Sequence, residues 1–445
     1  MKIIQMDKQN LELLEKIRQQ FESAPYPKVP LEKSPKNNPR SLYIHNFVTP
    51  YYLRNQKYIE TDGKIILDAG CGSGYKTLSL AEANPEAKIV GIDISEESVK
   101  LARQRLQFHG FDNAEFYCLT LEDLPILGME FDYINNDEVL YLITDPVSGL
   151  KAMKTVLRPN GIIRTNYHSS FQRNLYFRAQ EMFKYMGLME NHSQELAIEL
   201  VRETMKALQD HVHLKVTTWK PEFEKDDERV LANHLLQGDK GYTIPELFSA
   251  LRAADLEFIS MVNWKEWDLM SLFKEPNNLP VFLGISLPEI SVEERLHLFE
   301  LLQPIHRLLD FWCGHPNQAQ SYVPVEEWAD SDWQRVRVYL HPQLRTEKFK
   351  DNLITCVTQL VMLEMSQHLP IPEGTVTIDS TMAACLLPLT EGSQSMMSLV
   401  ERWKKLRPLH PVTLEPTEEG DAFELVKQLL TRLEGFGYVL LERLP

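Results

Sequence analysis

The sequence predicts an α/β fold with a doubly wound, largely parallel sheet, and two observations support this prediction. Between residues 64 and 168, short apolar segments alternate with amphipathic ones, which is typical of strands joined by right-handed helical crossovers. The first apolar segment, Ile65-Ile66-Leu67, leads into Asp68 and the glycine-rich turn Gly70-Cys71-Gly72-Ser73-Gly74. A buried strand followed by such a turn indicates the edge of the sheet at which a ligand binds.

The individual elements follow from apolar spacing and from capping residues. A helix over 8–22 is expected before the sheet, together with a helix that begins with Thr49 as N-cap and Pro50 at its first position. Ser95 is expected to cap the helix after the second strand. The expected strands are 64–68, 88–92, 114–119, 131–135 and 161–167, with helices after the glycine turn, after Ser95, directly after residue 138 and over 147–157.

The regular alternation ends after residue 168, where the sequence predicts a helical insertion at about 169–241. Strands at 256–262 and 281–287 are expected to continue the sheet beyond this insertion. Residues 291–445 predict a mainly helical domain whose closing helix, turn and strand resemble a winged helix. The expected domains are therefore an N-terminal helical lid over 1–60, a sheet domain over 61–290, and a C-terminal domain over 291–445 that binds a substrate or partner or has a regulatory role.

The composition limits the class of protein. Of the 445 residues, 43% are apolar and 25% charged, which is typical of a soluble globular protein, and the net charge of −16 argues against nucleic acid as the partner. The five cysteines are scattered and include no Cys-x-x-Cys, so we expect neither disulfides nor a metal site. The first residues lack the apolar core of a signal peptide, and no apolar stretch is long enough to span a membrane. We therefore expect a cytoplasmic protein.

Polar residues follow the expected strands at the point where each strand ends. Asp68, Asp93, Thr120, Asn136 and His168 all stand at such positions. Because the carboxyl ends of parallel strands meet at one edge of the sheet, these side chains are expected to form one site. Asp93 is suited to accept hydrogen bonds from both ribose hydroxyls of a nucleoside, since Ser95 already serves as the helix cap. The glycine spacing differs from the Gly-x-Gly-x-x-Gly of pyrophosphate-binding turns, which argues against a nicotinamide-dependent oxidoreductase.

Residues 60–168 resemble the class I S-adenosylmethionine-dependent methyltransferases, which implies a Rossmann-like sheet and S-adenosyl-L-methionine as the cofactor. In that family the glycine turn contacts the methionine part of the cofactor, and the loop after the third strand contacts adenine. The resemblance is carried by 68–74, Asp93, Leu124-Pro125, Phe131-Asp132 and Leu157-Arg158-Pro159-Asn160-Gly161, and is looser over 20–60 and 240–290. The cofactor-binding residues that it implies are Asp68, Gly70, Cys71, Gly72, Gly74, Asp93, Ile94, Thr120, Leu121, Glu122, Asn136 and the lid residue Tyr26.

In the same family the residues after the fourth strand lie beside the reactive methyl group. Here they are Asn135-Asn136-Asp137-Glu138, followed by Tyr141. The candidate catalytic residues are Asn136, Asp137, Tyr141 and His168. Two other interpretations stay open: Asn136 or Asp137 caps a helix, and His168 is a loop histidine that bonds a backbone carbonyl. The Asn/Asp-Pro-Pro-Tyr motif of one amino-methyltransferase group is absent, so the acceptor atom does not follow from the sequence.

The leading hypothesis is thus a methyltransferase whose acceptor is a protein side chain. The segment after residue 290 exceeds a minimal methyltransferase and loosely resembles regulatory-type domains of bacterial methyltransferases, some of which act on protein side chains. A large acceptor would explain the extra domain better than a metabolite, which needs only a closed pocket. Methylation of a small metabolite and a non-catalytic scaffold or sensor that binds the cofactor are the alternatives, and the sequence does not define the oligomeric state.

Overall fold

The computed structural model describes residues 2–189, 192–320, 322–369, 374–410 and 412–444. The chain forms two compact units. The first comprises Met1–Lys33, Ile65–Leu78 and Lys88–Pro316, and the second comprises Ser34–Lys64, Ser79–Ala87 and Asn317–Pro445. The candidate site lies in the first unit.

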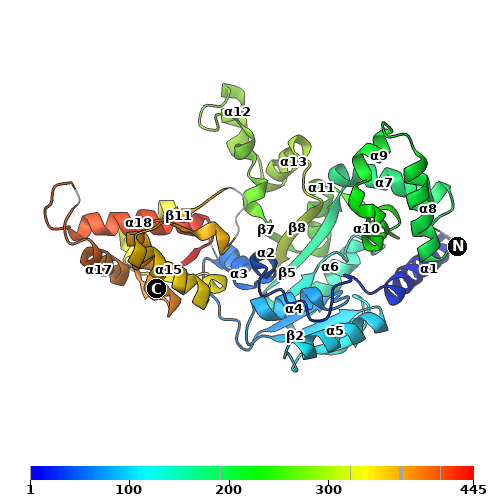
Figure 1. The fold of residues 1–445 in the computed structure, drawn as a ribbon, viewed down its shortest axis with the longest axis horizontal. Helices are drawn as coiled ribbons and strands as arrows, with labels where there is room; N and C mark the ends of the chain where they lie inside the picture. Colours follow the sequence, from blue (N-terminus) through cyan, green and yellow to red (C-terminus); the bar gives the residue numbers. More distant parts are fainter. Residues whose placement is uncertain (1, 190–191, 321, 370–373, 411, 445) are drawn as a thin grey trace. The chain divides into compact units, whose positions relative to one another are not determined.

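A central sheet organises the first unit, as Figure 1 shows. Among the described residues it has eight strands, with the order β3-β2-β1-β4-β5-β8-β7 and β6 paired to β5. Strands β1 to β6 pair in parallel, whereas β8 is antiparallel to both β5 and β7. The predicted doubly wound α/β sheet is confirmed. The strands are β1 Ile65–Ala69, β2 Lys88–Asp93, β3 Glu115–Cys118, β4 Phe131–Asn136, β5 Leu157–Ser169, β6 Gly241–Tyr242, β7 Glu257–Met261 and β8 Leu308–Gly314.

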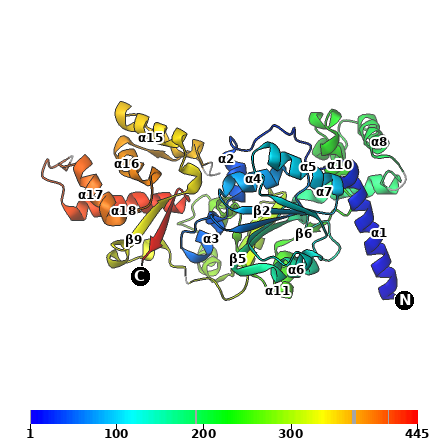
Figure 2. The same cartoon turned by 90° about the horizontal axis from the view of Figure 1, so that it is seen from below.

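Helices cover both faces of this sheet. In Figure 2, α5 lies on one face, and α6 and α11 lie on the other. Apolar residues of the central strands, such as Leu67, Val90, Ile134 and Ile163, are buried between these layers. The helices of this unit are α1 Lys2–Ser23, α5 Glu96–Phe108, α6 Pro146–Thr155, α7 Ser170–Tyr185, α8 Gln194–Ala207, α9 His213–Thr218, α10 Asp227–His234, α11 Ile244–Ala254, α12 Val281–Ser286 and α13 Val292–Leu302, and α4 Tyr75–Ala83 begins in it.

The helical insertion predicted after the fifth strand is confirmed and consists of α7 to α10. It has a hydrophobic core of its own, separate from that of the sheet. Phe183, Val201, Met205 and Val230 are buried in this core. The insertion is therefore a second packed layer whose polar residues can face the edge of the sheet.

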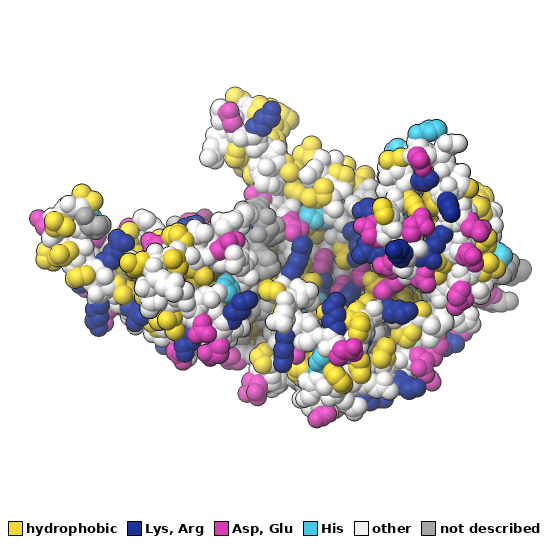
Figure 3. Space-filling view, in the orientation of Figure 1, with side chains coloured by type: hydrophobic (Ala, Val, Ile, Leu, Met, Phe, Trp, Pro, Cys, Tyr) yellow, Lys and Arg dark blue, Asp and Glu magenta, His cyan; other side chains and the backbone are white. Residues whose placement is uncertain are grey.

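Three predicted elements are wrong. Residues 281–287 are not a strand: α12 occupies Val281–Ser286, and its Val281, Phe282 and Ile285 are 68–78% exposed, part of the hydrophobic surface of this segment in Figure 3. The strand that completes the sheet is β8, so the boundary predicted at residue 290 falls before a strand of the sheet.

The other two differences concern helix starts. Residues 137–145 form turns instead of a helix, and the residue that caps the next helix is Asp145, whose side chain accepts from the amide of Val147. Neither Asn136 nor Asp137 is therefore a helix cap. The helix α3 Val48–Asn55 begins two residues earlier than predicted, and Thr49 does not cap it, because its hydroxyl lies 2.9 Å from His341 Nε2.

The second unit contains a three-stranded antiparallel sheet with the order β12-β9-β13, surrounded by helices. The helix, turn and strand predicted at its end are confirmed as α18 and β13, whereas the winged-helix assignment stays a prediction. No helix in the described segments is long and apolar enough to cross a membrane. Besides α3, the elements are α2 Pro39–His45, α14 Asp330–Trp333, β9 Val336–Leu340, α15 Glu347–Gln359, β10 Leu363–Glu364, β11 Thr377–Ile378, α16 Ser380–Leu386, β12 Gln394–Ser395, α17 Met396–Leu406, α18 Glu419–Gly435 and β13 Val439–Arg443.

Candidate active site

The glycine turn after β1 is tightly enclosed by its neighbours. Gly72 has a φ of +48°, and a Cβ there would lie 2.2 Å from the carbonyl oxygen of Tyr26. A Cβ on Gly74 would lie 2.5 Å from Ala102 Cα of α5. Gly72 thus permits a close approach of the N-terminal segment, and Gly74 permits close packing against α5.

The proline-rich segment 24–33, which we call the strap, is hydrogen-bonded to the glycine turn. The amide and the hydroxyl of Ser73 donate to the carbonyls of Tyr26 and Pro27, at 2.8 and 2.7 Å. Arg105 of α5, which is fully buried, extends these contacts. Its guanidinium donates to the carbonyls of Ser73, Pro30 and Val29 at 2.9, 2.7 and 2.7 Å. Because these bonds satisfy backbone groups that proline-rich sequence cannot pair in a helix or sheet, they define the position of the strap.

A cavity of about 450 Å³ lies at the carboxyl ends of β1, β2 and β3. Its volume is within the range of small-molecule sites. The strap contributes Tyr26, and the strand ends contribute most of the predicted cofactor-binding residues. The predicted residues that line this first cavity are Gly70, Gly72, Asp93, Ile94, Thr120, Leu121, Glu122 and Tyr26, together with the catalytic candidate Asp137.

Asp93 is the acid best placed for a nucleoside. Its Oδ2 accepts from the amide of Gly72 at 2.9 Å, and its Oδ1 accepts from the amide of Ser95 at 3.0 Å. Ser95 itself caps α5, as predicted. Burial raises the pKa of Asp93 to about 6. Each carboxylate oxygen retains a further lone pair, so the group can still accept from ribose hydroxyls in the cavity.

Four predicted cofactor-binding residues do not line the cavity. Asp68 is fully buried beneath the turn, where it accepts from Thr77 Oγ1 at 2.6 Å and Asn135 Nδ2 at 2.8 Å. Asn136 joins strands, since its Nδ2 donates to the carbonyl of Ala69 and its Oδ1 accepts from Thr165. The side chains or Cα positions of Asp68, Cys71, Gly74 and Asn136 pack within the sheet and against α5, and their contact with the cofactor stays a prediction.

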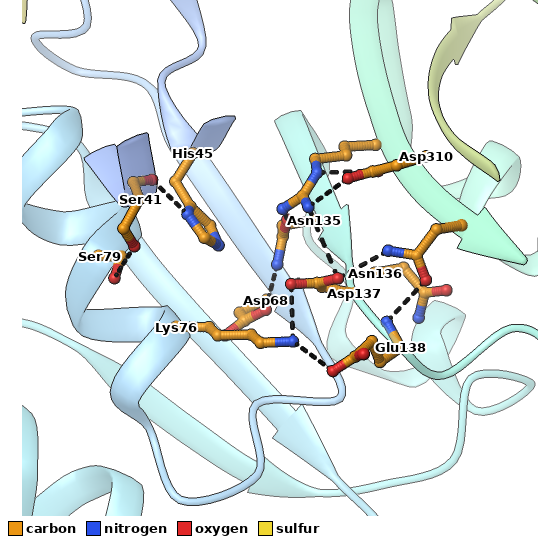
Figure 4. Close-up of polar contacts among 12 residues, drawn as sticks. Ser41, His45, Asp68, Lys76, Ser79, Asn135, Asn136, Asp137, Glu138 and Asp310 are labelled. Atoms are coloured by element: carbon orange, nitrogen blue, oxygen red, sulfur yellow. Dashed lines mark hydrogen bonds and ion pairs between the residues drawn. The ribbon is translucent and has the colours of Figure 1, made fainter. Parts of the chain in front are cut away.

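A network of buried charges includes Asp137 and Glu138, which line the cavity, and Figure 4 shows its polar contacts. Lys76 of α4 extends between Asp137 and Glu138, with Nζ 2.8 and 3.0 Å from their carboxylates. Arg164 of β5 lies 3.6 Å from the other oxygen of Asp137, which also accepts from Asn166 Nδ2 at 2.6 Å. Asp137 thus accepts from Lys76 and Asn166 and is paired with the Arg164 cation, which suits a structural anion better than a proton acceptor.

A second cavity of about 440 Å³ adjoins the first. Tyr26, Glu138, Phe21 and Leu142 line both cavities and form the wall between them. The candidates Tyr141 and His168 line the second cavity only, together with Arg307 and with acidic side chains of the insertion. The structure thus places Asp137 at the first cavity and the two ring residues at the second.

His168 has both ring nitrogens in hydrogen bonds. Its Nδ1 lies 2.6 Å from Asp239 Oδ1, and its Nε2 lies 3.1 Å from Arg307 Nη1. Because arginine only donates, Nε2 must accept and Nδ1 must carry the proton that it donates to Asp239. Burial lowers the pKa of His168 to about 4, so the ring is neutral. Its partners are a carboxylate and a guanidinium, not the backbone carbonyl considered above, and they occupy both nitrogens that a general base would use.

The two tyrosines at this site retain their protons. Tyr141 stacks on His168 with ring centroids 3.8 Å apart, and burial raises its pKa well above the usual range. The nearby Glu138 carboxylate raises the pKa of Tyr26 to about 12. Both side chains are therefore phenols at neutral pH, and each hydroxyl can donate a hydrogen bond.

Sequence reasoning did not identify Lys76, Arg105, Arg164, Arg307 or Asp310. Arg105 carried a signal, since it shares the inner face of α5 with Ala102 and Leu106, where a charged residue needs partners. No pattern in the sequence indicated Arg307 or Asp310, because their contacts depend on the pairing of β8 with β5.

Comparison with known proteins agrees with this geometry. Residues 60–244 match the family described as "Methyltransferase domain". A protein of Synechococcus described as uncharacterized is 27% identical over 316 residues, 70% of this chain and 73% of that protein. Demethylmenaquinone methyltransferase of Geobacillus stearothermophilus is 34% identical over 120 residues, 26% of this chain and 51% of that protein. This chain thus spans about half the length of that enzyme.

Among solved structures, PKMT2 from Rickettsia typhi has a similar fold. It superposes with a TM-score of 0.57 at 16% identity, over 90% of this chain and 76% of that chain. That protein has also been determined in complex with AdoHcy. At this identity the similarity concerns the fold.

The parallel sheet, the glycine turn and the family match define residues 60–244 as a class I methyltransferase domain. Residues 60–244 of the chain are accordingly an S-adenosylmethionine-dependent methyltransferase domain. The first cavity fits this cofactor, since glycine is required where the turn meets the strap and the carboxylate of Asp93 lines the cavity at the end of β2.

Proposed function

We propose that the first cavity binds S-adenosyl-L-methionine, that the second binds the acceptor, and that the acceptor is an amine on a protein side chain. The observation that carries this proposal is the shared wall of the two cavities, formed in part by Tyr26 and Glu138. In-line transfer requires donor and acceptor to meet across a short distance with water excluded. A wall common to both cavities is the place where such a meeting can occur.

The cofactor, when bound, supplies an electrophilic methyl group on a sulfonium centre. The chain's residues would place both partners around it: the glycine turn and Asp93 for the cofactor, and the second cavity for the acceptor. Burial alone raises the pKa of Glu138, but the charges of Lys76 and Arg307 outweigh it and lower the pKa well below its usual range. Glu138 is therefore an ionised carboxylate that can accept a hydrogen bond from an acceptor N–H.

The charge of the second cavity favours a cationic side chain. Glu195, Asp227 and Glu228 of the insertion line it, and Lys28 and Arg307 are its basic members. Glu228 Oε1 accepts from the amide of Lys28 at 3.2 Å, and burial raises the pKa of Glu228. We assign to Glu228 the proton that an ammonium acceptor must lose before its lone pair can attack.

The second unit supports a large acceptor. Residues 317–445 form a packed sheet and helices outside the matched methyltransferase domain, and a metabolite would not need them. We also propose the cytoplasm as the compartment, because none of the five cysteines, all of which are described, is in a disulfide.

Incubation with methyl-labelled S-adenosyl-L-methionine and a cell lysate tests this proposal. We expect label on lysine side chains in the protein fraction and its loss in Asp93→Ala. Label confined to small molecules would support a metabolite acceptor instead. Label in no fraction, with S-adenosylhomocysteine binding retained, would support a cofactor-binding scaffold.

A further inference from the structure

Arg307 lies outside the matched methyltransferase domain and yet reaches its candidate site. It precedes β8, and its carbonyl accepts from the amide of Ser169 at 2.9 Å, next to the end of β5. Its guanidinium donates from Nη1 to His168 Nε2 at 3.1 Å and from Nη2 to Glu138 Oε1. The side chain is 45% exposed and lines the second cavity.

We propose that Arg307 is a positioning residue for methyl transfer: one guanidinium fixes the Glu138 carboxylate in the wall between the two cavities and is itself oriented by His168. This inference rests on the proposed function, because it assumes that donor and acceptor meet at that wall. It adds a residue that the sequence analysis did not select and that lies beyond the matched family.

The geometry of Glu138 shows why it needs two cations. Its φ of +62° is uncommon for a residue with a side chain, and its amide donates to Asn166 Oδ1 at 2.9 Å. The backbone thus directs the side chain toward the cavities, where Lys76 binds Oε2 and Arg307 binds Oε1. With one cation on each oxygen, the carboxylate has a single orientation.

His168 fixes the opposite end of the guanidinium. Its proton on Nδ1 is required by Asp239, which is buried and also accepts from Arg173 Nη2 and Gln180 Nε2, both at 2.9 Å. The remaining Nε2 lone pair can only accept, and Arg307 is the donor that it faces. A continuous set of contacts therefore runs from the insertion through His168 and Arg307 to Glu138.

A lysine cannot reproduce this arrangement. The guanidinium is planar and presents two N–H groups in fixed directions, one to an imidazole and one to a carboxylate. An ammonium is a single point charge on a flexible stem, so it can neutralise Glu138 without fixing its orientation. Arg307→Lys keeps the positive charge but loses the planar fork, so the charge alone should not preserve methyl transfer.

The test compares Arg307→Ala and Arg307→Lys with the wild type, using the acceptor fraction identified above. We expect both variants to bind S-adenosylhomocysteine within about threefold of the wild type and to lose roughly 30-fold or more in kcat/KM, mainly in kcat. Because the side chain lines a cavity, guanidinium chloride at millimolar concentration should restore transfer in Arg307→Ala by roughly fivefold or more. The matched control, Arg295→Ala on the exposed face of α13, should behave as the wild type.

Two results would overturn the proposal. One is an unchanged kcat in Arg307→Ala. The other is restoration by guanidinium no better than by sodium chloride at equal ionic strength, which would indicate a merely structural role. Unfolding midpoints measured in parallel identify a variant that fails to fold, in which case Arg307→Gln replaces it.

A measurement that needs no methyl acceptor tests the contacts of Arg307 independently of the proposed function. NMR of histidine-labelled protein should show His168 neutral, with its proton on Nδ1, and in Arg307→Ala its pKa should rise because a neighbouring cation is lost. Asp239, Arg173 and Tyr141 face the same ring and are unchanged in this variant. A proton on Nε2 in the wild type would refute the orientation by His168 even if methyl transfer is observed. Failure of the wild type to transfer any methyl group, with the expected tautomer present, would refute the proposed function and the role in transfer while leaving the contacts intact.

Discussion

Arg164 of β5 and Asp310 of β8 form a two-point ion pair, with Nε 3.1 Å from Oδ1 and Nη2 2.7 Å from Oδ2. Arg164 is buried, and the side chain of Asp310 is 17% exposed. The same guanidinium donates to Asn135 Oδ1 at 2.9 Å. This pair therefore joins the antiparallel strand β8 to Asn135 near the end of β4, and so links the outer part of the sheet to the candidate site.

Replacement of Asp310 by Asn should destabilise the protein. Removal of one partner leaves a buried guanidinium with incomplete compensation, so we expect the free energy of unfolding to fall by about 3 kcal/mol. Denaturant titration monitored by circular dichroism measures this change. The matched control is Asp210→Asn, whose side chain is fully exposed beside Lys215 and which should leave the titration midpoint unchanged. Equal midpoints for the two variants would show that the ion pair does not stabilise the sheet.

Cofactor affinity should depend on pH through Asp93. Ribose hydroxyls donate to the carboxylate, so the affinity for S-adenosylhomocysteine should rise as the pH increases through about 6, the pKa of Asp93. The raised pKa of Asp93 has the opposite effect on the stability of the free protein. The carboxyl of the unfolded chain has a pKa near 4, so it releases its proton at a lower pH than the carboxyl of the folded protein does. The stability that the protonated group contributes is thus lost as the pH rises through about 6.

Calorimetry at several pH values measures this dependence. Asp93→Asn should bind weakly at every pH and show no transition near pH 6, whereas Asp112→Asn, at an exposed loop position, should retain it. A transition that persists in Asp93→Asn would assign the titration to another group.

The first five strands and their helices follow from local periodicity, which the sequence carries directly. Asp93, Thr120 and the glycine turn are at the predicted edge because they follow strands that pair in sequence order or nearly so. The later strands do not obey this rule. The pairing of β8 with β5 joins residues far apart in the chain. Val281, Phe282 and Ile285 have the apolar character of a strand but are exposed on the helix α12.

The residues around the site show the same limit. Asp68 lies near the end of β1, as a ligand-binding acid does, but its carboxylate already accepts from Thr77 and Asn135. An acid at a strand end can face a cavity or a neighbouring side chain. Tertiary packing decides between the two, and this packing cannot be derived from a single sequence. Arg307 illustrates the converse, because its role arises entirely from contacts across the fold.

His234 should make the insertion sensitive to acid. It is fully buried among Tyr176, Phe183, Trp219 and Phe223, and among the described residues neither ring nitrogen has a hydrogen-bond partner. Burial lowers its pKa to about 4. Because the unfolded histidine binds a proton first, the free energy of unfolding should fall as the pH decreases from about 6.5 to about 4, by roughly 2 kcal/mol between pH 7 and pH 5.

Unfolding followed by tryptophan fluorescence at the two pH values tests this expectation. His234→Phe retains an aromatic ring of similar size and should remove most of the loss, whereas His213→Phe, at an exposed position, should not. An unchanged pH dependence in His234→Phe would place the acid sensitivity elsewhere.

Substitution of Gly72 by Ala should displace the strap from the first cavity. The new Cβ would lie 2.2 Å from the carbonyl oxygen of Tyr26, and the left-handed backbone adds a strain of about 1 kcal/mol. Gly63→Ala is the matched control, because Gly63 has a similar φ of +68° but no neighbouring atom within 4 Å. The two variants share the strain, so the difference between them isolates the clash.

Displacement of the strap would break the hydrogen bonds from Ser73 to Tyr26 and Pro27. We therefore expect Gly72→Ala to bind S-adenosylhomocysteine at least about tenfold more weakly than Gly63→Ala, a loss of about 1.4 kcal/mol. Trypsin should also cleave at Lys28 faster in Gly72→Ala, since the strap would leave its hydrogen-bonded position. If both variants bind S-adenosylhomocysteine equally and resist trypsin equally, the strap adjusts to the new side chain without opening the cavity. The contribution of the strap to cofactor binding is then limited to Tyr26.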